Sequence, residues 1–104
     1  MIVDVRTYTL PPRKTKAYVE LFEQYGLPVQ RKYLGEPLAY FVSEIGALNQ
    51  VVHIWGFDSL ADMETKRAAR NADPAWADYL ARTEGYVIAQ EDKIMRPTSF
   101  SKIR

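Results

Sequence analysis

The chain has 104 residues, the length of a single domain, so separate cofactor and substrate lobes are excluded. Hydrophobic residues make up 47% and charged residues 26%, as in ordinary globular proteins, which argues against disorder. With 14 Lys plus Arg against 13 Asp plus Glu, no basic surface for nucleic acid or an anionic membrane is expected. The absence of cysteine excludes disulfides and thiol catalysis, and a single histidine leaves too few ligands for a Cys₂His₂ or His₃ metal site.

The first third of the chain predicts a strand followed by a helix. Ile2–Leu10 is rich in Val, Thr and Tyr, which suits a strand, and Pro11-Pro12 ends it. In Arg13–Tyr25 the apolar residues recur at spacings of three and four, as in an amphipathic helix. Gly26-Leu27-Pro28 is expected to interrupt this helix, because proline removes a backbone donor, and a short second helical piece then runs to Leu34.

The remainder predicts two strands, a helix in two parts and a last strand. Ser59 is a good N-cap, with Asp62 at the third position of a capping box, and Asp73-Pro74 has the pattern of a new helix start. Gly85 closes the second helical part. The expected segments are strands at Leu38–Glu44 and Gln50–Phe57, a helix at Ala61–Ala72 and a polar edge strand at Tyr86–Met95.

The order strand, helix, strand, strand, helix, strand is typical of the ferredoxin-like βαββαβ fold. In that fold two helices cover one face of a four-stranded antiparallel sheet. Right-handed crossovers place the first and third strands side by side in the middle. We therefore predict an α+β fold that forms one domain over residues 1–104.

The predicted third strand is apolar on both faces, with Val52 and Ile54 on one and Trp55 and Phe57 on the other. A strand with one wet face should alternate apolar and polar residues. Because two helices cover only one side of such a sheet, we expect a second copy of the chain to cover the other side. The prediction is a homodimer that packs through its sheets. The alternative is a far face that is merely apolar, or a register shift at a bulge.

Three stretches of the sequence resemble the NIPSNAP family of the dimeric α+β barrel superfamily: DVRTYTLPPRKTKAYVELFEQYGLP, FVSEIGALNQVVHIWGFDSLADMETKRAARNADPAW and RPTSFSKI. The resemblance covers nearly the whole chain and is most specific in the second stretch. It implies a ferredoxin-like subunit that dimerises through its sheet. It implies no established chemistry, since NIPSNAP proteins are mostly of unknown activity, although the superfamily includes small-molecule oxygenases, isomerases, cyclases and haem enzymes.

The candidate catalytic residues centre on His53, the only histidine. Its ordinary pKa of about 6.5 suits a general base. The neighbouring first strand is expected to bring Arg6 and Tyr8 to the same face, because they are two residues apart. Together with Trp55 they suggest a site for an aromatic or carboxylated ligand. In it Arg6 anchors the anion, Trp55 stacks on the ligand, and Tyr8 or Tyr40 is the proton partner of His53.

A structural interpretation of the same residues stays open. In it His53 is a core histidine satisfied by one hydrogen bond, and Arg6 pairs with Asp4 or Glu44 at the dimer seam. Arg67 and Arg70 lie beside the apolar stripe of their predicted helix. They either reach into a cavity between helices and sheet, where they bind an anion, or extend into water.

Two functions of different classes therefore remain. The first is a small cofactor-independent oxygenase or isomerase acting on an aromatic or enolisable metabolite. The second is a non-catalytic homodimer that binds a small molecule or a protein. No nucleotide-binding glycine motif or catalytic triad spacing is present, and no cofactor or metal is expected, with His53 as a haem ligand only a weak signal. The N-terminal MIVDVRTYTL is a short apolar stretch that carries Asp4 and Arg6, unlike a signal peptide, and no apolar run is long enough to span a bilayer. We therefore expect a cytoplasmic protein without membrane or nucleic-acid partners.

Overall fold

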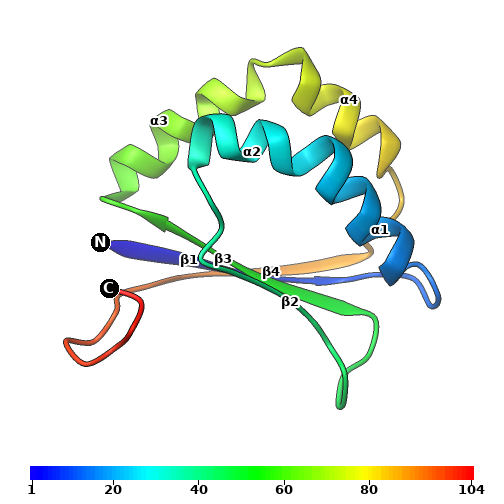
Figure 1. Cartoon of the computed structure of the whole chain (residues 1–104), viewed down its shortest axis with the longest axis horizontal. Coiled ribbons are helices and arrows are strands. Elements are labelled where there is room, and N and C mark those ends of the chain that lie inside the picture. Colours follow the sequence, from blue (N-terminus) through cyan, green and yellow to red (C-terminus); the bar gives the residue numbers. More distant parts are fainter.

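The computed structural model describes all residues, 1–104, as a sheet with helices on one of its faces (Figure 1). None of the helices combines the length and the apolar character that crossing a bilayer requires. The strands are β1 (Ile2–Thr9), β2 (Ala39–Val42), β3 (Gln50–Phe57) and β4 (Ala89–Met95). The helical segments are α1 (Thr15–Leu21), the π-helical η1 (Phe22–Gly26), α2 (Leu27–Leu34), α3 (Leu60–Asn71) and α4 (Pro74–Arg82).

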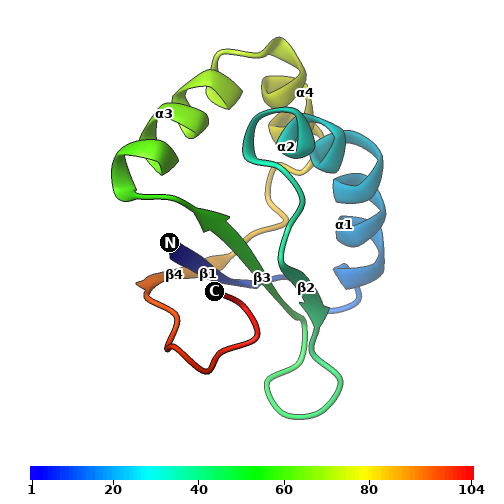
Figure 2. The same ribbon diagram turned by 60° about the vertical axis from the view of Figure 1, so that its left-hand side comes forward.

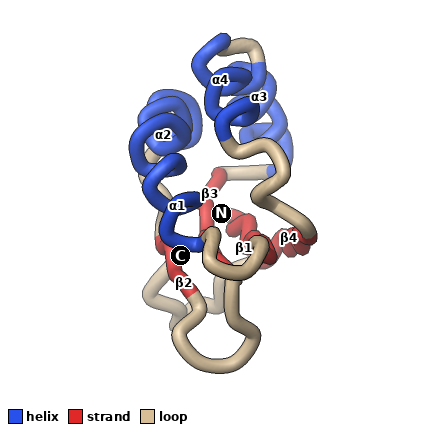
Figure 3. Tube along the Cα trace, turned by 90° about the vertical axis from the view of Figure 1, so that its right-hand side faces the viewer, coloured by secondary structure: helices blue, strands red, loops and turns tan.

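All four strands pair antiparallel, in the order β2-β3-β1-β4. This confirms the predicted α+β, ferredoxin-like architecture, with β1 and β3 in the middle and β4 at an edge. The helices form two rods that lie side by side on the sheet, one made of α1, η1 and α2 and the other of α3 and α4 (Figure 3). The space between these rods and the sheet is where the candidate site lies.

Two strands are shorter than the sequence predicts. β4 starts at Ala89 because the Tyr86 N–H bonds back to the Thr83 carbonyl at 3.1 Å, which forms a turn. β2 is confined to Ala39–Val42, although backbone hydrogen bonds from Leu38 and Ser43 to β3 extend the pairing by one residue at each end.

The predicted break at Gly26-Leu27-Pro28 is wrong, because the first rod stays helical from Thr15 to Leu34. The π turn ends at Gly26, so Pro28 falls at the second position of α2, where a missing N–H costs little. Gly26 allows the ring of Tyr79 in α4 to pack directly on the rod. A Cβ on Gly26 would lie only 2.8 Å from the Tyr79 Cε1 atom.

The caps of the second rod are as predicted. The Ser59 hydroxyl accepts a hydrogen bond from the Asp62 N–H at 3.1 Å. The Asp62 carboxylate accepts from the Asp58 N–H at 3.0 Å, one residue before the N-cap. The Asp73 carboxylate accepts from the Ala75 N–H at 2.9 Å and starts α4. These caps satisfy backbone donors that the helices leave free.

The helices cover the face of β3 that carries His53, Trp55 and Phe57, which are all buried. The core consists of two clusters on this face: Ile2, Phe22, Leu34, Trp55, Phe57 and Tyr79, and Leu10, Tyr18 and Val51. The opposite face, with Val52 and Ile54, is only partly buried, so these two residues, and not Trp55 and Phe57, face away from the helices. The β2–β3 loop and the C-terminal tail extend away from the helices (Figure 2).

Candidate functional site

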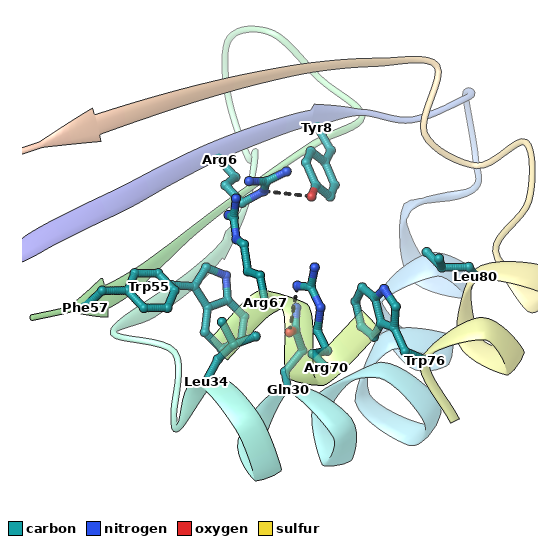
Figure 4. A pocket seen from close by; sticks show the side chains of 10 residues that line it. All are labelled: Arg6, Tyr8, Gln30, Leu34, Trp55, Phe57, Arg67, Arg70, Trp76 and Leu80. Atoms are coloured by element: carbon teal, nitrogen blue, oxygen red, sulfur yellow. Dashed lines mark hydrogen bonds between the residues drawn. The ribbon is translucent and has the colours of Figure 1, made fainter. Parts of the chain in front are cut away.

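Two adjoining cavities lie between the sheet and the helical rods. The first, which we call the arginine cavity, has a volume of about 240 Å³ and is drawn in Figure 4. The second, the histidine cavity, has a volume of about 270 Å³. The cavities share Tyr8, Gln30, Trp76 and Leu80 in their linings, so they lie next to each other.

The arginine cavity brings together side chains from the sheet and from α3. Arg6 comes from β1, whereas Arg67 and Arg70 extend from α3 toward the sheet (Figure 4). Trp55 of β3 and Trp76 of α4 are its aromatic walls. All four predicted ligand-binding residues, Arg6, Trp55, Arg67 and Arg70, thus line one cavity.

Arg6 is held by three neighbours. Its Nη1 atom lies 2.8 Å from Asp92 Oδ2 and 3.2 Å from Asp4 Oδ2. Its Nε–H donates to the Tyr8 hydroxyl at 2.9 Å. The structure therefore includes the pairing with Asp4 that the structural interpretation named, and adds Asp92 of β4.

Asp4 is fully buried between two guanidinium groups. It forms ion pairs with Arg6 and Arg67, and its Oδ1 atom has no hydrogen-bond partner. Burial, with a smaller contribution from a hydrogen bond to Asp92, raises the pKa of Asp4 to about 6. The neighbouring arginines oppose this rise without cancelling it. The carboxylate thus orients both arginines from beneath the cavity.

Arg70 has no carboxylate partner. Its guanidinium donates to Gln30 Oε1 at 3.1 Å and to Asn71 Oδ1 at 3.0 Å, and it stacks over the Trp76 ring at 4.3 Å. Burial, together with the positive charges of Arg67 and Arg6, lowers the pKa of Arg70 to about 10. Arg70 remains charged at neutral pH, and its charge is not balanced by any acid.

His53 lies opposite Arg6 in the β1–β3 ladder and is 3% exposed. Its Nδ1 atom accepts a hydrogen bond from the Trp55 indole N–H at 2.7 Å. Burial, with a further contribution from the Arg6 charge, lowers the pKa of His53 to about 3, so the ring is neutral at physiological pH. Because Nδ1 accepts, the proton of the neutral ring lies on Nε2.

The Nε2 atom of His53 is buried and has no hydrogen-bond partner, and His53 lines the histidine cavity. Two tyrosines hold the ring in place. Tyr40 stacks on it with ring centroids 4.7 Å apart, and Tyr8 meets it edge-on at the same distance. The imidazole of this lining residue is therefore held in place and has an N–H donor without a partner.

The predicted proton partners, Tyr8 and Tyr40, differ in position. Tyr8 lines both cavities. Tyr40 lines neither. Its ring is sandwiched between His53 and Phe22, its hydroxyl has no partner, and burial raises its pKa. Tyr40 supports the imidazole rather than reaching a ligand.

Residues of the site that are not among the predicted site residues include Asp4, which is buried behind the lining, and the lining residues Gln30 and Glu84. Asp4 has a signal in the sequence, because Asp4, Arg6 and Tyr8 alternate along one buried face of a strand. Gln30 on α2 and Glu84 in the turn after α4 have none that we can name. Glu84 is the carboxylate in the lining of the histidine cavity. No three of the His, Asp and Glu side chains come together as a metal site.

The fold and these cavities define a small ferredoxin-like α+β domain with a ligand-sized space between sheet and helices. The profile of the NIPSNAP family matches residues 3–102. The chain belongs to the NIPSNAP family.

Among curated relatives, Protein NipSnap homolog of Dictyostelium discoideum is 32% identical over 94 residues, which are 90% of this chain and 41% of the relative. Protein NipSnap of Drosophila melanogaster is 32% identical over 101 residues, covering 96% of this chain and 36% of the relative. The chain thus spans about two-fifths of the length of these relatives.

Among solved structures, a NIPSNAP family protein with unknown function from Agrobacterium tumefaciens has a TM-score of 0.96 and 40% identity, covering 100% of this chain and 94% of that one. An uncharacterized NIPSNAP-like domain protein from Burkholderia xenovorans has a TM-score of 0.91 and 39% identity, covering 96% and 87% of the two chains. An antibiotic biosynthesis monooxygenase shares only the fold, with a TM-score of 0.64 and 12% identity over 94% and 99% of the two chains.

Proposed function

We propose that this NIPSNAP protein is a small cofactor-independent isomerase or oxygenase that acts on an aromatic or enolisable metabolite. One observation carries the proposal: a buried, neutral His53 whose Nε2–H has no partner and which lines a cavity of ligand size. A buried donor without a partner is costly, and a ligand oxygen would satisfy it.

A substrate carbonyl that accepts from the His53 Nε2–H would gain most when it becomes an enolate. Negative charge then develops on its oxygen, and a fixed, buried donor stabilises that charge. Tyr8 is suited to assist, because its hydroxyl accepts from Arg6 and keeps its own O–H for donation. The aromatic lining from Tyr18, Phe22 and Tyr79 would contact a planar substrate.

The proton acceptor in this proposal is Glu84 and not His53, because an imidazole with a pKa of about 3 is a weak base. The C–H bond next to the carbonyl breaks, its electrons form the enolate, and the Glu84 carboxylate takes the proton. An isomerase would return that proton to a different carbon. An oxygenase would add dioxygen to the same anion.

Deuterium exchange tests this step without knowledge of the natural substrate. The probes are 4-phenyl-2-butanone and 2-oxo-4-phenylbutanoate in D₂O, with NMR detection of the protons next to the ketone. We expect the protein to accelerate exchange in at least one probe. Glu84→Gln should reduce the rate by about 10²–10⁴-fold and His53→Phe by about 10²–10³-fold.

Glu20→Gln, at an exposed position of α1, is the matched control and should exchange protons like the wild type. Thermal stabilisation by the probes without any accelerated exchange would contradict the enzyme and support the alternative, a non-catalytic ligand-binding homodimer. A homodimer and a cytoplasmic location remain part of the proposal. Light scattering tests the first, and cell fractionation the second.

A further inference from the structure

The charges around the arginine cavity do not balance. Three guanidinium groups, Arg6, Arg67 and Arg70, line it, and no carboxylate is in its lining. Behind the lining, Asp4 pairs with Arg6 and Arg67, and Asp92 pairs with Arg6. Three positive charges thus face two negative ones, and the charge without a counterpart is on Arg70.

Glu84 does not restore the balance. It lies at the neighbouring histidine cavity and forms no ion pair with any of the three arginines. Arg70 instead binds two neutral amide oxygens, those of Gln30 and Asn71. Amide oxygens are weaker partners for a guanidinium than a carboxylate is.

The same wall has an unused donor. The Nε atom of Arg67 is buried and has no hydrogen-bond partner. The guanidinium of Arg70 lies over the Trp76 ring at 4.3 Å and also bonds to Gln30 and Asn71, so these contacts hold it before any ligand arrives. A planar fork fixed in this way fits the planar geometry of a carboxylate.

We propose that the arginine cavity binds the carboxylate of a singly charged organic acid, with Arg70 as its main ligand and Arg67 as the second. The proposal rests on the proposed function in one respect: the rest of the acid extends past Tyr8 into the histidine cavity, where the reaction occurs. A single negative charge neutralises the excess of one. A phosphate dianion would bring one negative charge too many, and a neutral amide would leave the positive charge of Arg70 without a counterpart.

Three matched probes that lack a ketone test the proposal by calorimetry at pH 8: 3-phenylpropanoate, 3-phenylpropanamide and 2-phenylethyl phosphate. We expect the carboxylate to bind at least about tenfold more tightly than either of the others, the effect of one charge-assisted hydrogen bond. Arg70→Gln should weaken carboxylate binding about tenfold or more and leave amide binding unchanged.

Arg82→Gln is the control, because Arg82 is exposed, pairs with Asp78 and lines neither cavity. It should bind all three probes like the wild type. Equal affinity for carboxylate and amide, tighter binding of the phosphate, or an unchanged carboxylate affinity in a folded Arg70→Gln variant would each overturn the proposal.

This outcome is separate from that of the exchange experiment, because 3-phenylpropanoate has no enolisable ketone. Selective carboxylate binding without any exchange would leave this proposal standing and remove the enzymatic one. The ketones 4-phenyl-2-butanone and 2-oxo-4-phenylbutanoate differ by a methyl in place of the carboxylate. Equally accelerated exchange in both would support the enzymatic proposal and contradict the carboxylate site.

Discussion

His53 has aromatic rings on three sides and a guanidinium beside it in the ladder. Tyr8, Tyr40 and Trp55 exclude water from the imidazole, and Arg6 opposes a second positive charge. The same surroundings explain why the histidine is a donor and not a base, since burial favours the neutral form. The indole of Trp55 then decides which nitrogen bears the proton.

The low pKa of His53 makes stability depend on pH. The unfolded chain binds a proton at His53 near pH 6.5, whereas the folded chain binds it only near pH 3. Stability from this residue is therefore present above pH 6.5 and is lost as the pH falls below it. Asp4 acts in the opposite direction between about pH 4 and 6. Because its pKa is raised, the folded state binds this proton more tightly than the unfolded chain, so stability from Asp4 increases as the pH falls through this range. The charged groups that act on Asp4 are Arg6, Arg67 and Asp92.

A comparison with His53→Phe separates the two contributions, because Asp4 is present in both proteins. We expect the difference in free energy of unfolding between them to shrink by about 1.4 kcal/mol for each pH unit below 6. Urea unfolding at several pH values between 8 and 4 measures it. A difference that stays constant over this range would show that His53 titrates normally in the folded protein.

The helices and strands illustrate which features of this chain are encoded locally. The caps at Ser59 and Asp73 bond to N–H groups within three residues, so a short motif specifies them. The π turn at Phe22–Gly26 has no such motif. It coincides with the place where Tyr79, from a distant part of the sequence, packs against Gly26. Contacts of this kind cannot be read from periodicity alone.

Gly26→Ala tests that packing. The added methyl would meet the Tyr79 ring at 2.8 Å and the Phe22 ring at 2.9 Å, so the two rods must separate. We expect a loss of stability of about 1–3 kcal/mol, as for other overpacked cores, measured by urea unfolding. Gln24→Ala, at an exposed position of the same π segment, is the control. A Gly26→Ala protein as stable as the wild type would contradict the close packing.

The candidate site was predictable in part. Strand alternation places Arg6 and Tyr8 on one face, and antiparallel pairing brings that face beside His53. The sequence could not show which face of β3 meets the helices, because both are apolar. Arg67 points toward the sheet because it pairs with Asp4, and Arg70 because it bonds to Gln30. Both partners lie on other elements, so helix geometry alone could not predict these directions.

At the scale of the whole molecule, the far face of the sheet carries large apolar side chains that are exposed at its edges. Phe41 is 58% exposed and Met95 50%, and both lie on this face in register with Val52 and Val3. Only 16 of the 104 residues are buried within the single chain, so much of its apolar surface has no cover. These features are consistent with the predicted homodimer, which stays a prediction.

Light scattering at micromolar concentration should report about twice the 12.0 kDa mass of the chain. Phe41→Glu should convert the protein to a folded monomer, because a charge on this face cannot be buried without a partner. Ala69→Glu, at an exposed position of α3, should leave the dimer intact. A wild-type mass of 12.0 kDa would refute the homodimer.

The two cavities are formed entirely within one chain, with walls from β1, β3 and both helical rods. We therefore expect each polypeptide to bind its own ligand, with or without a second copy. Saturation should reach one equivalent per polypeptide and follow a simple hyperbola. Dilution that dissociates the copies should leave occupancy unchanged.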